Sequence, residues 1–326
     1  MTFSDRCVRA FLGLALGDAF GRPPGGEPAR TVPPDPERLV GTDDTRASLH
    51  LAEVVLGHGR DALVDETFGA AVARDVAARG ETWVAVADLH GHPAALDALI
   101  AWCDAHLGPE YRLATLGDYC DNGPDVPGLL DRLVRLSDER GDRFVPILGN
   151  HDLACLRAMA DEGWYEQWSR LYWNAGGATP AAYGARSGAE LARRMPAAHR
   201  AFLASLPWFH DTGRYLFVHA GLAPGPIEPQ LAPLRERRLP AERLHLPPPI
   251  RDKSLSRVAD PAWERVVVSG HNKHLGGPRF VGPNRICLSA EIDATGVLHA
   301  VVLPERRWLA VGRGGTVVVE PRVGAG

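Results

Sequence analysis

Three short motifs of acidic, amide and histidine residues could carry chemistry in this chain. In order they are Asp88-Leu-His90-Gly, Gly117-Asp118-x-x-Asp121-Asn-Gly and Gly149-Asn150-His151-Asp152. Carboxylate, amide and imidazole groups can hold two divalent cations about 3.5–4 Å apart, which clamp a phosphoryl group and lower the pKa of a bound water. Such a site also needs an acid for the leaving oxygen. The motifs therefore predict a two-metal hydrolase that acts on phosphate esters.

The elements around the motifs would bring these side chains together. Each motif follows a run typical of a buried strand, over residues 83–87, 112–116 and 144–148. Residues 94–106 and 126–137, which lie between the runs, have helical periodicity, so the order is β-α-β-α-β. In open α/β sheets ligands bind at the carboxyl ends of the strands. The three motifs are therefore expected to meet at one edge of a sheet.

Two later histidines also follow strand-like runs. Residues 215–218 lead into His219, and residues 265–269 lead into Gly270 and His271. Either histidine alone would more often be a core or capping residue. Because both share the strand-end position of the three motifs, we predict that both belong to the same functional site rather than to the core.

Residues from about 81 to 306 resemble the calcineurin-like metallophosphoesterase superfamily. Within it they resemble the branch of phosphoprotein phosphatases, diadenosine tetraphosphatases and the phosphatase domain of bacterial polynucleotide kinase-phosphatase. Besides the motifs above, the resemblance rests on Gly176-Gly177-x-Thr179, Phe217-Val-His219-Ala-Gly221 and Glu291-Ile-Asp293. It implies an α/β (α+β) fold of four layers, an αββα sandwich. It also implies in-line attack on phosphorus by a hydroxide that bridges two metals.

The resemblance implies a set of metal ligands, position by position. One metal would be held by the first two motifs, the second by the third motif and the two later histidines, with Asp118 bridging both. Asp293 would be a ligand of the first metal or lie beside it. Alternatively, Asp293 has only a structural role in a turn before Gly296. Some relatives have a metal ligand two residues after the position of His271, whereas His274 follows it by three. This difference favours a place for His274 at the surface or at the rim of the pocket. The implied metal ligands are Asp88, His90, Asp118, Asn150, His219, His271 and Asp293.

Catalytic and substrate-binding roles follow from the same resemblance. His151 would be the general acid, oriented by Asp152, because a carboxylate bonded to one ring nitrogen fixes the tautomer. Phosphoprotein phosphatases usually carry an arginine after Asp121 that grips the phosphate, whereas this chain has Asn122. Arg251 fits the place of the branch's other phosphate-binding arginine. We therefore predict that Arg251 and Asn122 contact the substrate. We also expect this chain to bind a phosphate dianion more weakly than an enzyme that has arginine at position 122.

The predicted enzyme is a phosphomonoesterase with two divalent metal ions. The mixed oxygen and nitrogen ligands suit manganese as the expected activator, with iron or zinc as alternatives. The alternatives are a dinucleoside polyphosphate hydrolase or phosphodiesterase of the same fold, and a catalytically inactive binding module. An inactive relative would usually have lost a ligand or the acid, and every one is present. The substrate could be a small molecule, a nucleotide or a phosphoprotein.

Composition is consistent with a cytoplasmic enzyme. The 36 basic and 40 acidic residues give a net charge of −4, which predicts no general affinity for nucleic acid or membranes. The five cysteines are dispersed and predict reduced thiols, and Cys120 is expected to be a small buried residue. No run approaches the roughly 18 apolar residues of a membrane span.

The first 75 residues are predicted to be a short helical appendage before a phosphoesterase domain at 80–326. Residues 9–21 and the triplet Thr42-Asp43-Asp44 resemble the opening of ADP-ribosylglycohydrolases. That all-helical family binds metal with this triplet and a C-terminal Asp-x-Asp-Thr motif, which this chain lacks. We therefore expect helices at about 4–20 and 43–56, the second capped by Thr42. An ADP-ribose-directed hydrolase is the alternative.

Overall fold

The computed structural model describes residues 81–172, 177–240, 245–273, 279–280, 282–288 and 292–320. All of them lie in one unit, Glu81–Gly326. The two predicted N-terminal helices, Cys7 and His274 lie outside the described residues, so the expectations for them stay predictions.

The first sheet contains the predicted β-α-β-α-β unit. Strands β1 (Trp83–Val86), β2 (Arg112–Thr115) and β3 (Phe144–Pro146) are parallel, and helices α4 (Pro93–Leu107) and α5 (Val126–Arg140) connect them. A meander of β9 (Val297–Leu303), β10 (Arg307–Gly312) and β11 (Val317–Glu320) extends the sheet by antiparallel pairing with β1. The strand order is β11-β10-β9-β1-β2-β3, so the motifs after β1, β2 and β3 meet at one edge as predicted.

The second sheet carries the strands that precede the two later histidines. Its order is β4-β5-β6-β8-β7, with β5, β6 and β8 parallel to one another. His219 follows β5 directly, and His271 follows β6 after Gly270. The strands are β4 (Phe209–Asp211), β5 (Tyr215–Val218), β6 (Val266–Ser269), β7 (Arg279–Phe280) and β8 (Arg285–Cys287).

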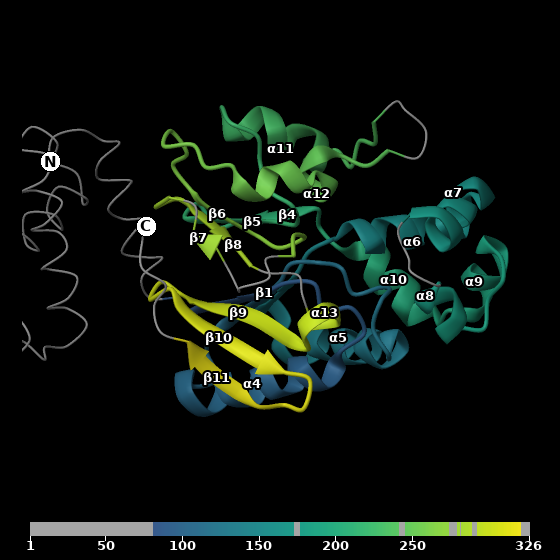
Figure 1. Ribbon diagram of the computed structural model, residues 1–326, viewed down its shortest axis with the longest axis horizontal. Helices are drawn as coiled ribbons and strands as arrows, with labels where there is room; N and C mark the ends of the chain where they lie inside the picture. The colour runs from purple at the N-terminus through teal and green to yellow at the C-terminus, as the bar shows by residue number, and fades with distance from the viewer. Residues whose placement is uncertain are drawn as a thin grey trace, which may run out of the picture. The chain divides into compact units, whose positions relative to one another are not determined.

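The alternation of side chains along β1 explains the layers. Trp83 and Ala85 face a core that they share with Phe217 of the second sheet, whereas Val84 and Val86 belong to the core that includes α4 and α5. Helices α11 (Ile227–Arg235) and α12 (Pro248–Arg251) cover the outer side of the second sheet (Figure 1). The result is the expected four-layer sandwich, with helices outside and two sheets between them.

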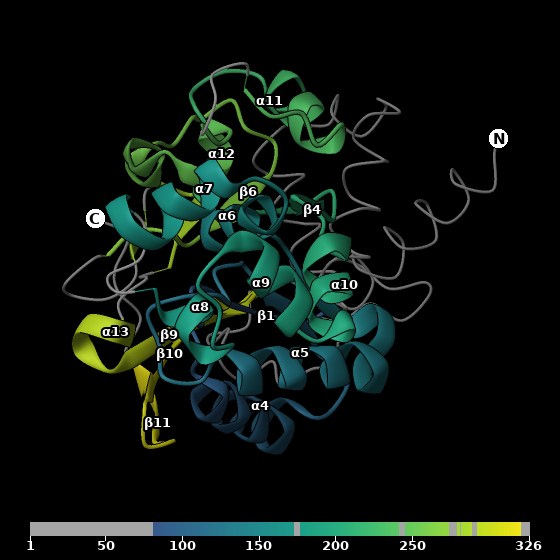
Figure 2. The ribbon, with the colours of Figure 1, turned by 90° about the vertical axis from the view of Figure 1, so that its right-hand side faces the viewer.

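A block of short helices follows β3 and stands beside the sandwich (Figure 1), and it faces the viewer in Figure 2. Its first helix begins at Asn150, so the third motif lies at the joint between sheet and block. Tyr183 bonds His199 Nδ1 at 2.7 Å and Asp131 of α5 bonds His199 Nε2 at 2.9 Å, which ties the block to the sandwich. The helices of the block are α6 (Asn150–Ala160), α7 (Glu162–Glu166), the π-helical η4 (Gln167–Tyr172), α8 (Ala178–Ala182), α9 (Gly188–Arg194) and α10 (Ala197–Ser205). Shorter turns elsewhere are η3 (Gly141–Arg143), η5 (Lys253–Arg257) and α13 (Ile292–Thr295).

The described cysteines lie in the interior. Cys103, Cys120, Cys155 and Cys287 are all buried and form no disulfide, which confirms the prediction that Cys120 is a buried small residue. Across the described part of the chain, each helix is too short or too polar to cross a bilayer.

Candidate metal centre

The backbone at the strand ends bends sharply so that the motif side chains point inward together. Asp88 (φ 55°), Asp118 (φ 57°) and His271 (φ 69°) all adopt the left-handed conformation that non-glycine residues rarely take. Such strain tends to gather at functional sites, where the surrounding structure must hold it in place. Gly149 is required for the same packing, because a Cβ there would overlap Asp118.

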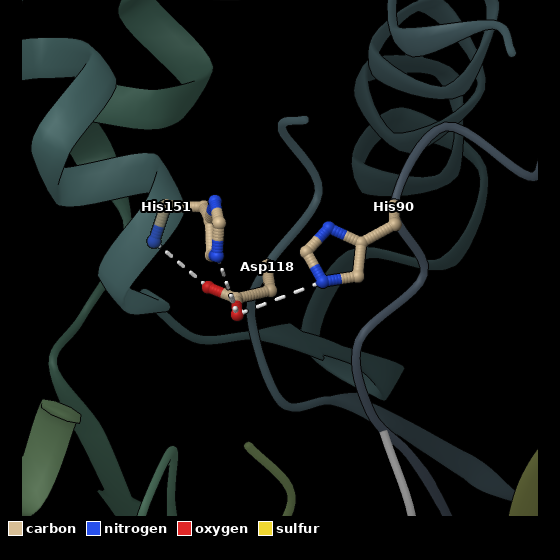
Figure 3. A group of neighbouring side chains, drawn as sticks. All are labelled: His90, Asp118 and His151. Atoms are coloured by element: carbon tan, nitrogen blue, oxygen red, sulfur yellow. Dashed lines mark hydrogen bonds and ion pairs between the residues drawn. The ribbon is translucent and has the colours of Figure 1, made fainter. Parts of the chain in front are cut away.

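Asp118 lies at the centre of the site, where it faces three imidazole rings. Its Oδ2 lies 3.3 Å from His219 Nε2, 3.8 Å from His90 Nε2 and 4.0 Å from His151 Nε2. Its Oδ1 accepts the backbone N–H of His151 at 2.9 Å. Figure 3 shows the carboxylate between His90 and His151. A single buried carboxylate with ligands on both sides is suited to bridge two cations.

The outer nitrogen of each predicted histidine ligand is hydrogen-bonded to the backbone. A carbonyl oxygen can only accept, so that ring nitrogen carries a proton, and the other nitrogen, which faces the centre, is the one that would bind a cation. This arrangement is typical of metal-binding histidines. The three bonds are His90 Nδ1 to Cys120 O at 2.8 Å, His219 Nδ1 to Leu116 O at 2.6 Å, and His271 Nε2 to Arg251 O at 2.9 Å.

The inner ligand atoms converge on two places that share Asp118. His219 Nε2 lies 3.2 Å from His271 Nδ1 and 3.0 Å from Asn150 Oδ1. Within each of two groups, His90-Asp118-His151 and Asp118-His219-His271, the ligand atoms lie within 4.8 Å of one another. Two adjacent groups with a common carboxylate fit a pair of divalent cations.

The electrostatics of the centre also favour cations. Burial opposes the charge of His219, but Asp118 outweighs it and raises the pKa of His219 to about 9. Burial raises the pKa of Asp88 to about 6, and the neighbouring Asp118 adds to this effect. Two buried carboxylates therefore share one site, where added positive charge would stabilise both. Asp88 Oδ2 also accepts the backbone N–H of His271 at 2.9 Å, which joins the two sheets.

Asp293 lies beside the centre, with a histidine as its neighbour. It belongs to α13, and its Oδ1 lies 3.3 Å from His92 Nε2. It is not among the described residues that line the central cavity. Its role as a metal ligand stays a prediction.

The structure corrects the assignment of the residue that orients His151. His151 Nδ1 donates to Asp121 Oδ2 at 2.7 Å, whereas the prediction gave this contact to Asp152. Asp152 follows His151 on α6, and adjacent residues on a helix point in different directions. Asp121 comes from the loop after β2 and faces the ring. Burial opposes the charge of His151, but Asp118 and Asp121 raise its pKa to about 9.

Asp121 is itself held by two donors that the sequence did not reveal. Its carboxylate is fully buried and accepts Trp168 Nε1–H at 2.6 Å and the Thr179 hydroxyl at 2.6 Å. The Thr179 oxygen also accepts the backbone N–H of Asp121 at 2.8 Å. Thr179 could have been linked to the site through its Gly-Gly-x-Thr motif. Trp168 lies in the π-helical segment η4, and such irregular helices are often found at functional sites. No sequence pattern indicated the contact of Trp168 with Asp121.

Asp152 instead clamps the loops that carry the ligands. Both carboxylate oxygens are used, and every donor is a backbone amide of the second or third motif. The donors are the N–H groups of Asp118 (2.8 Å), Tyr119 (2.9 Å), Cys120 (3.1 Å) and Gly149 (2.9 Å). Asp152 is fully buried, so it has a structural part in holding the site.

Replacing Asp152 with alanine should therefore destabilise the fold strongly. Four buried amides would lose their acceptor, and each unsatisfied group costs about 1–3 kcal/mol, so we expect a loss of about 3 kcal/mol or more. Denaturant unfolding of Asp152→Ala measures this loss. The matched control is Asp125→Ala, which removes an exposed cap from α5 and should cost about 1 kcal/mol. Equal losses in the two variants would contradict the clamp.

The ligand atoms open into a cavity of about 730 Å³. Asn122 is exposed at its wall, with its amide nitrogen 3.4 Å from His90 Nε2. Arg251 lines the same cavity from the end of α12. The structure thus brings both predicted substrate-binding residues to the metal centre, and their contact with substrate stays a prediction. The cavity lining comprises Asp88, His90, Asp118, Asn122, Asn150, His151, His245, Leu246, Pro248, Arg251, Asp252, Lys253, His271 and Lys273.

A family comparison agrees with this geometry. Residues 82–300, which include the three motifs and both later histidines, match the model of the calcineurin-like phosphoesterases. The chain belongs to this family. A calcineurin-like phosphoesterase is a hydrolase of phosphate esters, so the chain is an enzyme of this class. The resemblance of the N-terminal segment to ADP-ribosylglycohydrolases stays a prediction.

Several solved structures are similar to this phosphoesterase at low sequence identity. A candidate diadenosine tetraphosphatase is 21% identical with a TM-score of 0.48, covering 71% of this chain and 93% of its own. A cold-active protein-tyrosine phosphatase of a psychrophilic Shewanella species is 16% identical, with a TM-score of 0.49 and coverage of 73% and 80%. A protein serine/threonine phosphatase of Saccharomyces cerevisiae, similar to human PP5, is 15% identical, with a TM-score of 0.42 and coverage of 74% and 79%. No curated protein matches the chain.

Proposed function

We propose that this phosphoesterase is a phosphomonoesterase that uses two divalent cations held around Asp118. The observation that supports this most directly is the convergence of two ligand groups on one buried carboxylate. We propose Asp88 and His90 as further ligands on one side, and Asn150, His219 and His271 on the other. Asp293 is proposed as a neighbour of the first cation.

The chain's own residues would prepare the phosphate for cleavage. When bound, the cations supply polarisation of the phosphoryl oxygens and a water of lowered pKa. His151 would give the proton of its Nε2 to the leaving oxygen, because its Nδ1 proton is engaged by Asp121. A pKa raised to about 9 keeps that proton on the ring near neutral pH. Asp121 holds the ring in place and stabilises its charge.

Manganese is the proposed activating metal, because the ligands combine carboxylate, amide and imidazole without thiolate. A dinucleoside polyphosphate or a phosphodiester is the alternative substrate within the same chemistry. The cytoplasm is the proposed compartment, since buried free thiols such as Cys120 and Cys155 suit its reducing conditions.

Metal reconstitution tests the proposed function. The full chain would be stripped with a chelator and reloaded with manganese, iron or zinc, and aryl phosphate hydrolysis and bound metal would be measured together. We expect two ions per chain at saturation and activity that follows their binding. Full activity with one ion would overturn the two-metal proposal. Metal and phosphate binding without turnover for any metal would identify an inactive binding module.

Asn122 and Arg251 should determine how strongly the enzyme prefers phosphate monoesters over diesters. A charge-assisted contact contributes about 1.5–3 kcal/mol, so Arg251→Ala should lower kcat/KM for a monoester about tenfold or more. Asn122→Arg should raise monoester activity relative to diester activity, because an added cation favours the dianion. The measurement is the monoester-to-diester ratio of kcat/KM in the parent and both variants. An unchanged ratio in both would show that neither residue contacts the phosphate.

A further inference from the structure

Lysine is almost absent from this chain, and its positions are therefore informative. Among 36 lysine and arginine residues, Lys253 and Lys273 are the only lysines in the whole sequence. Both line the cavity of the metal centre. Arginine and lysine differ in chemistry, since lysine presents a compact ammonium with three rotatable donors and arginine a planar fork. The two compact cations of the chain thus lie at one place, beside the predicted phosphate site.

Two hydrogen bonds hold the lysine-bearing segments side by side. Lys253 begins η5, two residues after Arg251, and Lys273 stands two residues after His271. His271 Nε2–H donates to Arg251 O at 2.9 Å, and Asn272 Nδ2–H donates to Lys253 O at 3.0 Å. The segment that supplies a metal ligand is therefore fixed to the segment that supplies Arg251 and Lys253. This pairing brings both lysines to the same cavity from two different parts of the chain.

Among the described residues, neither ammonium group is held in a close ion pair, although Lys273 lies near enough to Asp293 to help lower the pKa of that carboxyl. Within the described parts of the chain, no carboxylate lies within 4.0 Å of either lysine nitrogen, and both residues are exposed to the cavity. The nearest acid in sequence, Asp252, is engaged by the backbone N–H and hydroxyl of Ser254 at 2.9 and 2.7 Å. By contrast, Arg132 and Arg140 are paired with carboxylates of the neighbouring helix α4. The lysines are thus not needed to hold the fold through ion pairs.

We propose that Lys253 and Lys273 form a second anion subsite that binds a further phosphate of the substrate, beyond the phosphate being cleaved. This inference rests on the proposed function, which places the scissile phosphate at the metal centre. The ligand class is a compact oligophosphate, in which a second phosphate follows the first. A cavity of about 730 Å³ lies in the range that accommodates a small molecule rather than a single phosphate group. Without an arginine at position 122, this pair supplies much of the cationic charge around an extended anion.

Competition between two inhibitors would test the subsite. Imidodiphosphate carries two linked phosphoryl groups that resist hydrolysis, and orthophosphate carries one. Inhibition constants for both would be measured with an aryl phosphate substrate, with free manganese kept constant by a metal buffer. The variants are Lys253→Met, Lys273→Met, the double variant and the charge-conserving Lys253→Arg and Lys273→Arg. Arg257→Met is the matched control, because it removes an exposed cation of η5 that does not line the cavity.

The preference for imidodiphosphate should depend on the lysines. We expect the parent to bind imidodiphosphate more tightly than orthophosphate, and the double variant to lose about tenfold in this preference. Orthophosphate binding should change by less than about threefold in the same variant, and Arg257→Met should behave as the parent. The arginine variants should retain much of the preference. A parent without preference, or a double variant that keeps it, would overturn the subsite.

Calorimetric titration of the manganese-loaded protein separates this inference from the proposed function. If the parent hydrolyses aryl phosphates but binds both anions equally, the phosphoesterase proposal stands and the subsite fails. If no phosphate ester is hydrolysed but imidodiphosphate binding is lost in the lysine variants, the subsite stands and the proposed activity fails. Equal weakening of both anions in the double variant would assign the lysines to the scissile phosphate and also overturn the subsite.

Discussion

Replacing Asp118 with asparagine is expected to lower kcat/KM for aryl phosphates by about 10²–10³-fold or more. The carboxylate lies 3.3 Å from His219 and 3.8 Å from His90, so it is the shared member of both ligand groups. An amide of the same shape carries no negative charge and offers only one oxygen. We therefore expect the variant to hold fewer than two metal ions per chain at concentrations that saturate the parent.

Metal content and folding must be measured beside the kinetics. Asp118 Oδ1 also accepts the backbone N–H of His151, so denaturant unfolding shows whether the loss of activity reflects a damaged loop. The matched control is Asp138→Asn on the exposed face of α5, which should leave activity and metal content at parental values. An Asp118→Asn protein with two ions per chain and parental kcat/KM would exclude Asp118 as the bridge.

The arrangement of the ligands could be predicted because local patterns are sufficient to specify it. Buried four- and three-residue strands such as Trp83–Val86 and Phe144–Pro146 leave a clear run of apolar residues, and the residue after each run must lie at the strand's carboxyl end. Parallel pairing then brings those ends to one edge. The positions of His219 and His271 follow from the same rule applied to the second sheet.

The support of the acid could not be predicted because it depends on contacts between distant segments. Trp168 lies 47 residues from Asp121 in sequence, and its indole N–H reaches the carboxylate only through the packing of the helical block. The assignment of Asp152 was wrong for a local reason: it stands next to His151 on a helix, and neighbouring helical side chains diverge. Its four amide contacts depend on how the loops after β2 and β3 fold together.

The positions of the positively charged residues that line the cavity were difficult to predict from the sequence for a different reason. Arg251 and Lys253 come from a segment whose sequence indicates only loops and short helices, with no strand to fix its position, whereas Lys273 follows β6 closely. Their common location follows from two hydrogen bonds in which a side chain donates to a backbone carbonyl, His271 Nε2–H to Arg251 O and Asn272 Nδ2–H to Lys253 O. A single sequence contains no periodic pattern for such irregular pairing, so substrate choice is harder to predict than metal binding.

The acid pair of His151 and Asp121 should be revealed by the dependence of rate on the leaving group. An alkyl phosphate releases a basic alkoxide that needs a proton, whereas an aryl phosphate with an electron-poor ring releases a stable phenolate. Since general acid catalysis contributes about 10²–10⁴-fold, His151→Ala should slow alkyl phosphates by that order and the activated aryl phosphate much less. Metal content should be unchanged if His151 is the acid and not an essential ligand.

Variants of the neighbouring carboxylates separate the two candidates for the orienting residue. Asp121→Asn should reproduce the leaving-group effect of His151→Ala in milder form, because the amide no longer stabilises a charged imidazole bonded at 2.7 Å. Trp168→Phe removes one donor to Asp121. It should therefore slow alkyl phosphates relative to the activated aryl phosphate, as Asp121→Asn does, but by a smaller amount. Trp164→Phe is its control, because Trp164 is a buried tryptophan of α7 whose ring, within the described part of the chain, contacts Arg157 rather than the Asp121 carboxylate.

The decisive comparison is the ratio of kcat/KM for an activated aryl phosphate to that for an alkyl phosphate. It should rise in the variants of His151 and Asp121 and stay near the parental value in Asp152→Asn, whose carboxylate bonds backbone amides instead of the ring. Parental alkyl phosphate hydrolysis by His151→Ala would exclude His151 as the acid. A raised ratio in Asp152→Asn with none in Asp121→Asn would return the orienting role to Asp152. Because the ratio compares two substrates of one protein, a variant that merely folds less well would lower both rates and leave it unchanged.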